Sequence, residues 1–510
     1  MNWSFVLENN AKELPGKEAI IFGERRLTYR DLNTRVNALA KGLLDLGVGR
    51  GDVVALLLYN CPEFVELTFA VNKIGAIWLP LNFRLAGEEI VYVLNHGDVK
   101  VLVSEMDFSE AIINIKDNLP KVKEYICIGE YIPTGWKSYE AMVKGKLGST
   151  VSDAEVELDD IHKLLYTSGT TAHPKGAVIT YGNLLSKNLS HAVEFKICPD
   201  DKAVMAAPMF HIGFDIAPST IWFMGGSVVI LRRFDPKEVL EIVQRERLTI
   251  IPFVPAMLLR LFQEPAFDNY DLSSVRLIID GGEKIPVPTL EKIREKFPDA
   301  WFARGYGLTE TVSGDTFLKE GTPIEKMVSD GKPVPGVRVR IVNDDGKELS
   351  AGKWGEVVIK GPKVFKGYWK NDEATAEAIK GGWFHTGDIG YLDEEGYLYI
   401  EDRKKDMIIS GGENIASAEV ERVIYELSQV LEVAVVGIPH PKWLEVPKAF
   451  VVLKEGETLT EQNIVDHCLK KLAKFKVPKE IEFTSQLPRT PSGKVLKRDL
   501  RKGTLGGVNY

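Results

Sequence analysis

The chain has 510 residues, more than one hydrophobic core usually holds, so we expect more than one packed unit. Its 45% hydrophobic and 27% charged residues are typical of a globular protein and exclude the disordered and fibrous classes. The formal net charge of -8 argues against a large sequence-independent nucleic-acid footprint. The four cysteines form no Cys-x-x-Cys pair, so neither a disulfide framework nor a cysteine zinc site is expected.

No targeting or membrane-spanning segment is expected. Residues 1–20 lack the basic start and the apolar run of a signal peptide, which together with the sparse cysteines predicts a cytoplasmic protein. The longest apolar stretch, Ile216 to Leu231, is interrupted by proline, glycine and serine and is too short to cross a bilayer. We expect a buried helix followed by a strand in this stretch.

From Leu27 to Leu318, segments with helical periodicity alternate with short apolar runs. The first four such segments are a helix at 26–47, a strand at 52–60, a helix at 63–76 and a strand at 77–82. This alternation predicts a doubly wound α/β region with largely parallel sheets that helices cover. After Gly331, alternating strands surround Asp-Gly and Glu-Gly turns, which predicts a small β-rich subdomain of antiparallel hairpins.

Beyond Lys404 the chain predicts a separate small α+β domain. Its expected elements are strands at 407–410, 432–438 and 448–453 and helices at 417–427 and 461–475. The boundary falls near Asp402 to Asp406. We therefore expect two domains, a large N-terminal α/β domain at 1–403 and a small C-terminal domain at 404–510.

The strongest local signal is YTSGTTAHPKG at residues 166–176, directly after an apolar run. A strand that ends in hydroxyl and glycine residues gives a loop whose N–H groups and hydroxyls can cradle phosphate oxygens, and Lys175 adds a mobile positive charge. Gly169 and Lys175 have the spacing of a Walker loop, but its second glycine and its metal-binding hydroxyl are missing. Any short piece of this segment could be an exposed turn, whereas the whole segment favours a triphosphate loop.

This segment resembles the signature of the adenylate-forming superfamily, which includes acyl-CoA synthetases, peptide-synthetase adenylation domains and firefly luciferase. The other signatures of that family follow in order, so the resemblance covers essentially the whole chain. It implies that the nucleotide phosphates lie on a loop formed by Thr167, Ser168, Gly169, Thr170 and Thr171. Lys175 would act with this loop as a catalytic cation.

Two further glycine-containing segments resemble the adenine side of the family's nucleotide site. In RGYGLTET, at 304–311, the resemblance places Tyr306 and Gly307 against the adenine and Thr309 on the α-phosphate, with Glu310 and Thr167 holding Mg²⁺. DGGEK, at 280–284, would supply a second adenine-side loop. That loop comprises Gly281, Gly282 and Glu283. Either segment alone could be an ordinary tight turn.

Two signatures in the last third of the chain carry charged residues. In WFHTGD, at 383–388, the resemblance implies that Asp388 binds the ribose hydroxyls, and Arg403 would meet the same ribose. In PRTPSGKVLKRDL, at 488–500, Lys494 would be the catalytic lysine that brings the substrate carboxylate and the α-phosphate together. The alternatives are a solvated turn for the first segment and a basic surface run for the second.

The residues that contact the acyl group and coenzyme A have weaker sequence signals. PMFHIGFD, at 208–215, resembles the segment that forms the acyl gate in acyl-CoA synthetases. The residues expected at the acyl group are His211, Phe214 and Trp222. Asp215 does not sit at the spacing of the ammonium-binding aspartate of amino-acid-activating domains, which disfavours an α-amino acid as substrate.

For the second half-reaction, the segment 408–414 resembles the loop that the small domain brings to the thiol tunnel. The residues expected near coenzyme A are Gly411, Gly412, Trp443 and Lys474. Leu444 stands where the family frequently has glycine. Lys405 matches the hinge about which the small, mobile domain would rotate between the half-reactions.

These observations predict a ligase of the acyl-CoA synthetase branch. A carboxylic acid, expected to be a medium- or long-chain fatty acid or an aryl acid, would react with Mg-ATP to give acyl-AMP and pyrophosphate, and CoA would then displace AMP. The cofactor would be Mg²⁺, with ATP and coenzyme A as co-substrates, a role in fatty acid metabolism is expected, and a homodimer is left open.

Three rival functions follow from the same signatures. The first is a free-standing adenylation enzyme that loads a carrier protein, and the second is a luciferase-like oxygenase that consumes the same adenylate with O₂. The third is a non-catalytic nucleotide sensor, which the joint presence of Lys175, Glu310 and Lys494 argues against.

Overall fold

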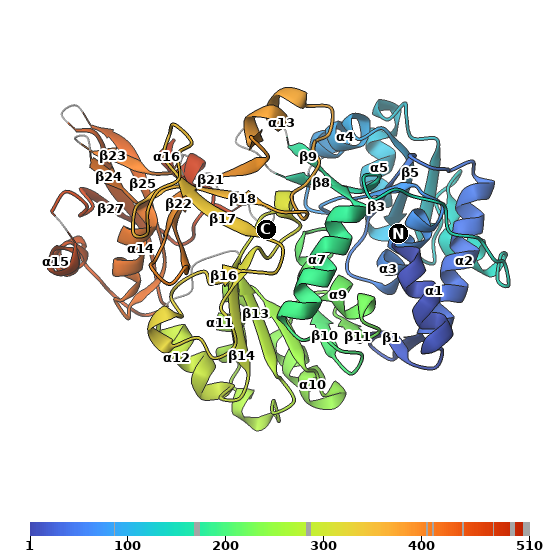
Figure 1. Cartoon of the computed structure of the whole chain (residues 1–510), viewed down its shortest axis with the longest axis horizontal. Coiled ribbons are helices and arrows are strands. Elements are labelled where there is room, and N and C mark those ends of the chain that lie inside the picture. Colours follow the sequence, from blue (N-terminus) through green and yellow to red (C-terminus); the bar gives the residue numbers. More distant parts are fainter. Residues whose placement is uncertain are drawn as a thin grey trace. The chain divides into compact units, whose positions relative to one another are not determined.

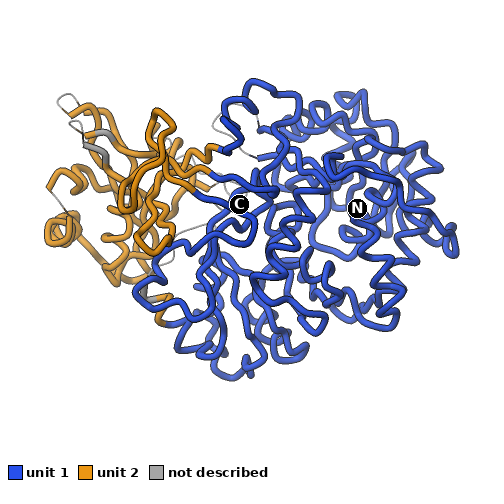
Figure 2. Tube along the Cα trace, viewed as in Figure 1, with its two compact units in different colours: residues 1–284, 292–339, 359–384 blue, residues 285–291, 340–358, 385–510 orange. Residues whose placement is uncertain are grey.

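We analysed a computed structural model of the chain. It describes residues 1–85, 87–167, 174–281, 287–403, 406–410, 413–440, 443–472, 474–489 and 495–502. The chain forms two compact units, coloured separately in Figure 2. The first comprises 1–284, 292–339 and 359–384, and the second comprises 285–291, 340–358 and 385–510.

The first unit contains two large, mainly parallel sheets. The nine-stranded sheet has the order β16-β15-β14-β13-β12-β10-β11-β1-β2. Its strands are β1 (Glu18–Phe22), β2 (Arg25–Thr28), β10 (Lys202–Met205), β11 (Ser227–Ile230), β12 (Ile250–Phe253), β13 (Leu277–Gly281), β14 (Trp301–Tyr306), β15 (Thr316–Phe317) and β16 (Lys332–Pro333).

The eight-stranded sheet has the order β19-β9-β8-β4-β3-β5-β6-β7. Its strands are β3 (Val53–Leu57), β4 (Ile77–Pro80), β5 (Val99–Glu105), β6 (Glu124–Ile128), β7 (Lys137–Ser138), β8 (Ile161–Thr167), β9 (Lys175–Thr180) and β19 (Gly367–Tyr368). In both sheets the central pairs are parallel, as expected for doubly wound sheets, and the antiparallel pairs lie toward the ends of the strand order.

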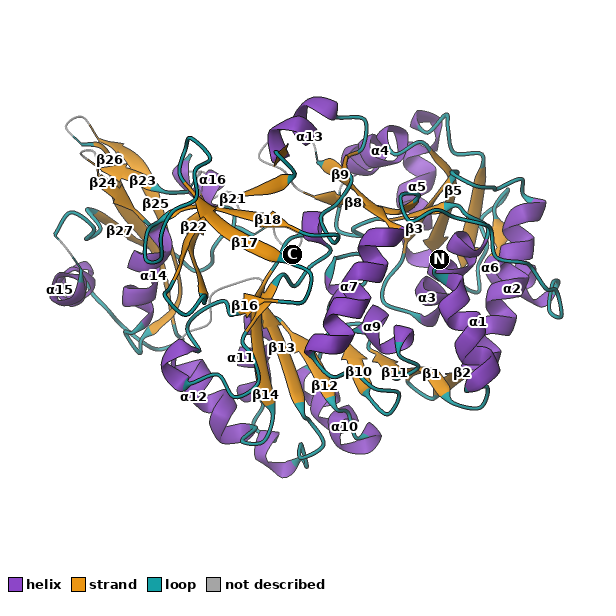
Figure 3. Ribbon diagram, in the orientation of Figure 1, coloured by secondary structure: helices purple, strands orange, loops and turns teal. Residues whose placement is uncertain are grey.

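Helices cover these sheets, as Figures 1 and 3 show. They are α1 (Ser4–Glu13), α2 (Tyr29–Asp45), α3 (Pro62–Lys73), α4 (Gly87–His96), α5 (Ser109–Ile115), α6 (Tyr139–Lys144), α7 (Tyr181–Glu194), α8 (Gly213–Ile216), α9 (Pro218–Phe223), α10 (Pro236–Glu246), α11 (Pro255–Phe262), α12 (Val287–Lys296) and α13 (Asp372–Ala378). The alternation predicted from residues 26–82 is confirmed by α2, β3, α3 and β4. The helix and strand expected between Ile216 and Leu231 are α9 and β11.

Strand β3 illustrates why the eight-stranded sheet is apolar on both faces. Val54 and Leu56 belong to the main hydrophobic core, whereas Val53, Ala55 and Leu57 belong to a second core on the other face. Successive side chains of a strand point to opposite faces, so a continuous apolar run is what a doubly covered strand requires.

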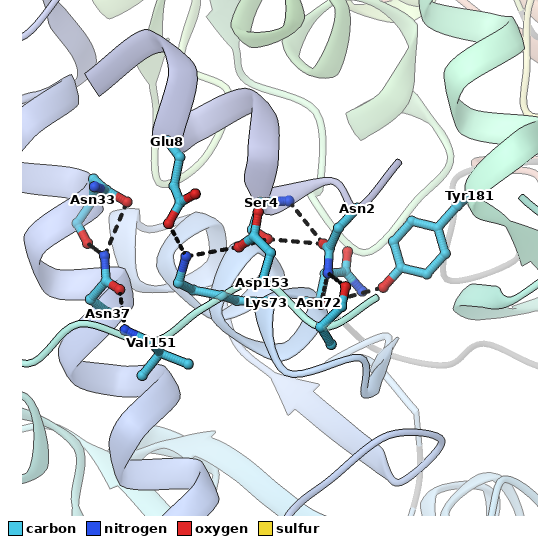
Figure 4. A network of polar contacts seen from close by, with 11 residues as sticks. Asn2, Ser4, Glu8, Asn33, Asn37, Asn72, Lys73, Val151, Asp153 and Tyr181 are labelled. Carbon is cyan, nitrogen blue, oxygen red and sulfur yellow. Dashed lines mark hydrogen bonds and ion pairs between the residues drawn. The ribbon is translucent and has the colours of Figure 1, made fainter. Parts of the chain in front are cut away.

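A polar network at the start of the chain connects α1 and the residues before it to the segment that leads into β8, the strand before the predicted phosphate loop (Figure 4). The Asn2 side-chain amide donates to the carbonyl oxygens of Asn72 and Ala154, at 2.8 and 3.1 Å. The buried ammonium of Lys73 lies 2.8 Å from Asp153 and 2.6 Å from Glu8. The segment that leads into β8 is therefore held from two sides.

A third, five-stranded sheet has the order β17-β18-β21-β20, with β22 paired to β21. Its strands are β17 (Arg338–Val342), β18 (Gly355–Lys360), β20 (Ile379–Lys380), β21 (Trp383–Leu392) and β22 (Leu398–Arg403). The antiparallel hairpin β21-β22 confirms the β-rich part expected after Gly331.

The rest of the second unit is an α+β arrangement around a five-stranded sheet ordered β24-β23-β26-β25, with β27 paired to β26. Its elements are β23 (Ile408–Ser410), β24 (Glu413–Ile415), α14 (Ser417–Tyr425), β25 (Val430–His440), β26 (Leu444–Leu453), α15 (Glu461–Lys471), β27 (Glu480–Phe483) and α16 (Lys497–Arg501). Helix α15 ends at Lys471 rather than at Phe475, because Leu472 is extended. The predicted α/β fold class with a small α+β part is confirmed. No helix in the described ranges is long and apolar enough to cross a membrane.

Candidate active site

The two ends of the predicted phosphate loop lie opposite each other in the antiparallel pair β8-β9. Thr167 is the last residue of β8 and faces Lys175, the first residue of β9. Ser168, Gly169, Thr170 and Thr171 lie outside the described residues. Because the sheet register pairs Thr167 with Lys175, seven residues, 168–174, connect the two paired ends.

Beside this loop, a cation, a phenol and a carboxylate come together from three segments. The Lys175 Nζ atom lies 5.1 Å from the centre of the Tyr368 ring. The Tyr368 hydroxyl donates to Glu310 Oε1 at 2.9 Å. Tyr368 lies on β19, which pairs with β9, and the Glu310 carbonyl accepts from the Phe365 N–H at 2.7 Å. All three side chains are half-buried, so they can reach a ligand.

The sequence analysis did not identify Tyr368. Its only signal is the segment Lys366-Gly367-Tyr368, which precedes no recognisable loop motif. The contact with Glu310 joins residues 58 positions apart and depends on the pairing of β19 with β9.

The loop after β14 makes a tight turn. Tyr306 ends β14 and pairs with Thr316 in β15. A Cβ atom on Gly307 would lie 2.2 Å from the Gly314 nitrogen, so only glycine fits at this close approach. Thr309 and Glu310 begin a short 3-10 turn, Thr309–Thr311. The turn therefore presents Tyr306, Thr309 and Glu310 within a five-residue span.

A buried ion pair contacts this turn through Thr311 and Ser313. The Lys363 ammonium lies 3.2 Å from Asp315 Oδ1 and donates to the Ser313 carbonyl at 2.7 Å. Asp315 also accepts a hydrogen bond from the Thr311 hydroxyl. Burial lowers the pKa of Lys363 and raises the pKa of Asp315, and their mutual attraction opposes both shifts.

The second predicted adenine-side loop follows β13, the neighbour of β14. Gly281 ends β13 directly opposite Gly305, and a Cβ atom on Gly281 would lie 2.8 Å from the Gly305 carbonyl oxygen. Gly282 and Glu283 lie outside the described residues. Both adenine-side segments thus leave the carboxyl end of adjacent parallel strands, where α/β sheets bind their ligands.

The buried Arg304, the first residue of the segment 304–311, pairs with Asp330. Its Nη2 atom lies 3.3 Å from Asp330 Oδ1.

In the second unit, the two predicted ribose residues occupy neighbouring strands. Asp388 on β21 stands opposite Arg403 on β22 in the sheet register. Asp388 is buried, and its N–H donates to the Thr386 hydroxyl at 3.0 Å. The Arg403 side chain lies outside what is described, as do Lys405, Gly411, Gly412 and Lys494.

The residues expected at the acyl group differ in their surroundings. His211 is half-buried, with its ring 4.4 Å from that of Phe210. Phe214 and Trp222 are buried in the main core with their ring centres 5.7 Å apart. The Trp222 indole N–H already donates to the Ala19 carbonyl at 2.9 Å.

A second buried ion pair lies next to this segment. Asp215 is 1% exposed, and its carboxylate pairs with the ammonium of Lys163 on β8. Burial lowers the pKa of Lys163, and Asp215 opposes that shift. The sequence analysis singled out Asp215 but not its partner.

The residues predicted near coenzyme A that are described, Trp443 and Lys474, are both exposed. Trp443 precedes β26, and its N–H donates to His440 Nδ1 at 3.2 Å. Leu444, at the position where the family frequently has glycine, has a left-handed backbone with φ of 69° and a side chain that is exposed.

With this geometry described, comparisons with known proteins define the class of the chain. A model of the AMP-binding enzyme family matches residues 7–369, and a model of the AMP-binding enzyme C-terminal domain matches residues 419–494. The chain therefore belongs to the AMP-binding enzyme family.

Individual relatives refine this class. Feruloyl-CoA synthase of an Amycolatopsis species is 38% identical over 96% of this chain and 97% of its own. A long-chain-fatty-acid–CoA ligase, FadD13 of Mycobacterium tuberculosis, is 36% identical over 98% of both chains. The anthranilate CoA ligase AuaEII, solved with anthranoyl-AMP, superposes with a TM-score of 0.92 at 30% identity, over 99% of this chain and 97% of its own. Within the family, the chain is an AMP-forming acid–thiol ligase.

Proposed function

We propose that this ligase activates an apolar carboxylic acid as an acyl-adenylate with Mg-ATP and then transfers the acyl group to coenzyme A. The observation that carries the adenylation step is the group formed by Lys175, Tyr368 and Glu310. A mobile cation and a carboxylate on adjacent segments suit a triphosphate and its metal ion.

The residues present fit Mg-ATP. Glu310 offers a half-buried carboxylate, which the Tyr368 hydroxyl orients through a hydrogen bond of 2.9 Å, and Thr167 offers a hydroxyl at the end of β8. Mg²⁺ prefers a few hard oxygen ligands from the protein and takes the rest from phosphates and water. This agrees with the described residues, in which no cluster of three or more His, Cys, Asp or Glu side chains could hold a metal by itself. When bound, the ion would neutralise charge that develops on the phosphates.

The chain's own residues would bind, orient and neutralise the two reacting anions. Lys175 would hold the outer phosphates, and Thr309 the α-phosphate. Asp388 and Arg403, opposite each other in β21 and β22, would hold the ribose. Lys494 would bring the substrate carboxylate to the α-phosphate, since the reaction needs in-line positioning and charge neutralisation rather than a covalent enzyme intermediate.

We also propose that residues 1–403 and 404–510 act as two domains with a hinge at Lys405. Rotation about this hinge would exchange Lys494 for the Gly411-Gly412 loop between the two half-reactions. Trp443 and Lys474 would then contact coenzyme A. Their exposure supports a role at a surface that a second substrate reaches.

The buried pair of Asp215 with Lys163 supports an acid without an α-ammonium group. An aspartate that is 1% exposed and already neutralised by a lysine has no charge to offer an amino acid. The acid would be an aryl acid or a medium- or long-chain fatty acid, the classes named for its relatives, with His211 beside its carboxyl end and Phe214 and Trp222 forming the packed support of the acyl site. We place the reaction in the cytoplasm.

A panel of acids tests this proposal. Ferulate, anthranilate, octanoate and palmitate would be compared with phenylalanine, and pyrophosphate release would be measured with and without coenzyme A. We expect release with one of the apolar acids, none with phenylalanine, and free thioester only when coenzyme A is present. Pyrophosphate release that depends on phenylalanine would contradict the proposed acid class. Turnover with oxygen uptake, or thioester formed only on a carrier protein, would contradict the proposed acceptor.

A further inference from the structure

The loop that carries Lys494 is closed by a short stem whose two sides are described. The Leu496 N–H donates to the Pro488 carbonyl at 2.7 Å, and Arg489 and Val495 form an antiparallel bridge. Residues 490–494 join the two sides of this stem. Lys494 precedes the paired residue Val495 in the chain. The contacts that fix the stem therefore also restrict the position of Lys494.

The chain enters α16 directly after the stem. Leu500 on this helix is buried with Val436 and Phe450, on one face of the sheet. Val495 packs against the same cluster, so apolar contacts anchor both Val495 and α16, and polar contacts hold the turn between them.

Lys497, the first residue of α16, supplies those contacts. Its ammonium lies 2.8 Å from Glu421 Oε1 and donates to the Ser417 hydroxyl at 2.5 Å, so it reaches two residues of α14. Glu421 is itself oriented by the Val435 N–H, which donates to it at 2.7 Å. Burial lowers the pKa of Lys497, but Glu421, Asp402 and Asp406 outweigh burial and raise it, so the side chain stays a cation.

The same contacts continue to both sides of Lys405. The Ser417 hydroxyl and N–H both donate to Asp402 on β22, the N–H at 2.7 Å. Arg501, at the other end of α16, lies 2.9 Å from Asp406. The segment after Lys494 is thus connected to the residues that flank the proposed hinge.

We propose that Lys497 is a positioning residue for adenylation, which holds the segment directly after Lys494 against α14 and, through Ser417, against Asp402. This inference rests on the proposed function, in which Lys494 serves only the first half-reaction. The alternative is that Lys497 is an ordinary surface charge, but its side chain is mostly buried and has two partners on α14. A misplaced reacting group costs rate at unchanged binding, because substrate affinity comes from other residues.

The test compares Lys497→Met with Lys497→Arg, and Arg498→Met serves as the matched control. Arg498 is the next residue, is largely exposed and pairs only with its neighbour Asp499 among the described contacts. Pyrophosphate release in a single turnover would report adenylation, and thioester formation from supplied acyl-AMP would report the second half-reaction.

We expect Lys497→Met to lower the adenylation rate about 10- to 100-fold at unchanged KM for ATP and acid, with thioester formation altered less than about twofold. Lys497→Arg should recover most of the rate, and Arg498→Met should match the wild type. Ser417→Ala removes the hydroxyl that joins Lys497 to Asp402 but keeps the backbone N–H contact, so it should show the same selective loss to a smaller degree.

An equal fall in both half-reactions of a variant with normal melting behaviour would overturn the proposal, and so would an unchanged adenylation rate in Lys497→Met. If Lys497→Met does not fold, Ser417→Ala decides alone by the same two rates. Lys494→Ala, measured in parallel, distinguishes failure of the positioning role of Lys497 from failure of the proposed function. If it abolishes adenylation while Lys497→Met and Ser417→Ala do nothing, only the positioning role fails. If Lys494→Ala leaves adenylation intact, the role of Lys494 in the proposed function fails and the positioning role fails with it.

Discussion

Two paired lysines of the molecule differ in exposure. Lys363 contacts the residues that follow the Thr309–Glu310 turn, and Lys497 lies in the segment after Lys494. The Lys363 side chain is 2% exposed and its partner Asp315 is fully buried, whereas the Lys497 side chain is 17% exposed and Arg501 is 28% exposed. Breaking a fully buried pair leaves a charge that nothing compensates, which costs stability. Breaking a pair that water partly reaches costs less stability than breaking a fully buried one. The comparison teaches that the Thr309–Glu310 turn rests on a pair inside the folded core, while the segment after Lys494 is held by contacts nearer the solvent.

Substitution of Lys494 should give the largest effect, and it should fall on catalysis alone. In the proposed function Lys494 supplies the charge that pairs the two reacting anions, so Lys494→Ala should lower adenylate formation by about 10²- to 10³-fold or more. Thioester formation from supplied acyl-AMP and the melting temperature should not change. Rates of both half-reactions check this. If the rates of both half-reactions fall together in a folded variant, Lys494 does not act on adenylation alone.

Substitution of Lys363 should act on stability instead. Lys363→Met leaves Asp315 buried without its partner, so the first unit should lose about 3 to 5 kcal/mol of unfolding free energy. Lys366→Met is the control, because that lysine lies three positions away in an exposed pair with Asp159 and should cost less than about 1 kcal/mol. Denaturant unfolding measures both variants. Equal effects in the two variants would show that the Lys363 pair is not buried as described.

Substitution of Glu310, which lies on the turn that Lys363 supports, should change metal use without unfolding the turn. An amide is a poorer Mg²⁺ ligand than a carboxylate. Glu310→Gln should therefore raise the Mg²⁺ concentration for half-maximal adenylation about tenfold, equivalent to about 1.4 kcal/mol. Glu320→Gln, in an exposed pair with Lys196, serves as the control. An unchanged Mg²⁺ dependence in Glu310→Gln would place the metal elsewhere.

The smallest effect is expected at Leu444, an exposed residue of the second unit. A non-glycine residue with φ of 69° is strained, and this side chain, 67% exposed, packs against little. Leu444→Gly should stabilise the second unit by about 0.5 to 1 kcal/mol. Leu431→Gly, at an exposed position inside β25, should destabilise it by a similar amount. Thermal melting compares them, and destabilisation of both would refute the strain.

Local sequence patterns predicted the fold well where burial and periodicity agree. Helix α2 has an apolar face of period 3.6 and begins at the capping box of Thr28 with Asp31, so its existence and start can be read from neighbouring residues. The long strands β25 and β26 were expected to be shorter, because Pro439 and Pro447 usually mark the end of a strand. Pairing along the whole hairpin overrides that local preference.

The candidate site could be predicted only as far as its motifs extend. Lys175, Glu310 and Asp388 were found because each lies in a recognisable segment. Lys363 and Lys163 were not, because a lysine usually indicates solvent, and their partners lie 48 and 52 positions away. Nothing local tells a buried, paired lysine from an exposed one. The contact between Tyr368 and Glu310 likewise depends on a strand pairing that no short segment encodes.

The network at the start of the chain has a consequence for folding during synthesis. Asn2 and helix α1 are translated before the residues that they contact: Asn2 bonds to Asn72 and Ala154, and Asn10 donates to the Trp222 carbonyl at 2.7 Å. These partners are translated 70, 152 and 212 residues later, and a short helix is marginal in water without tertiary contacts. The last of these contacts can form only once α9, which contains Trp222, has been made, so this segment is translated well before the residues that complete its native contacts.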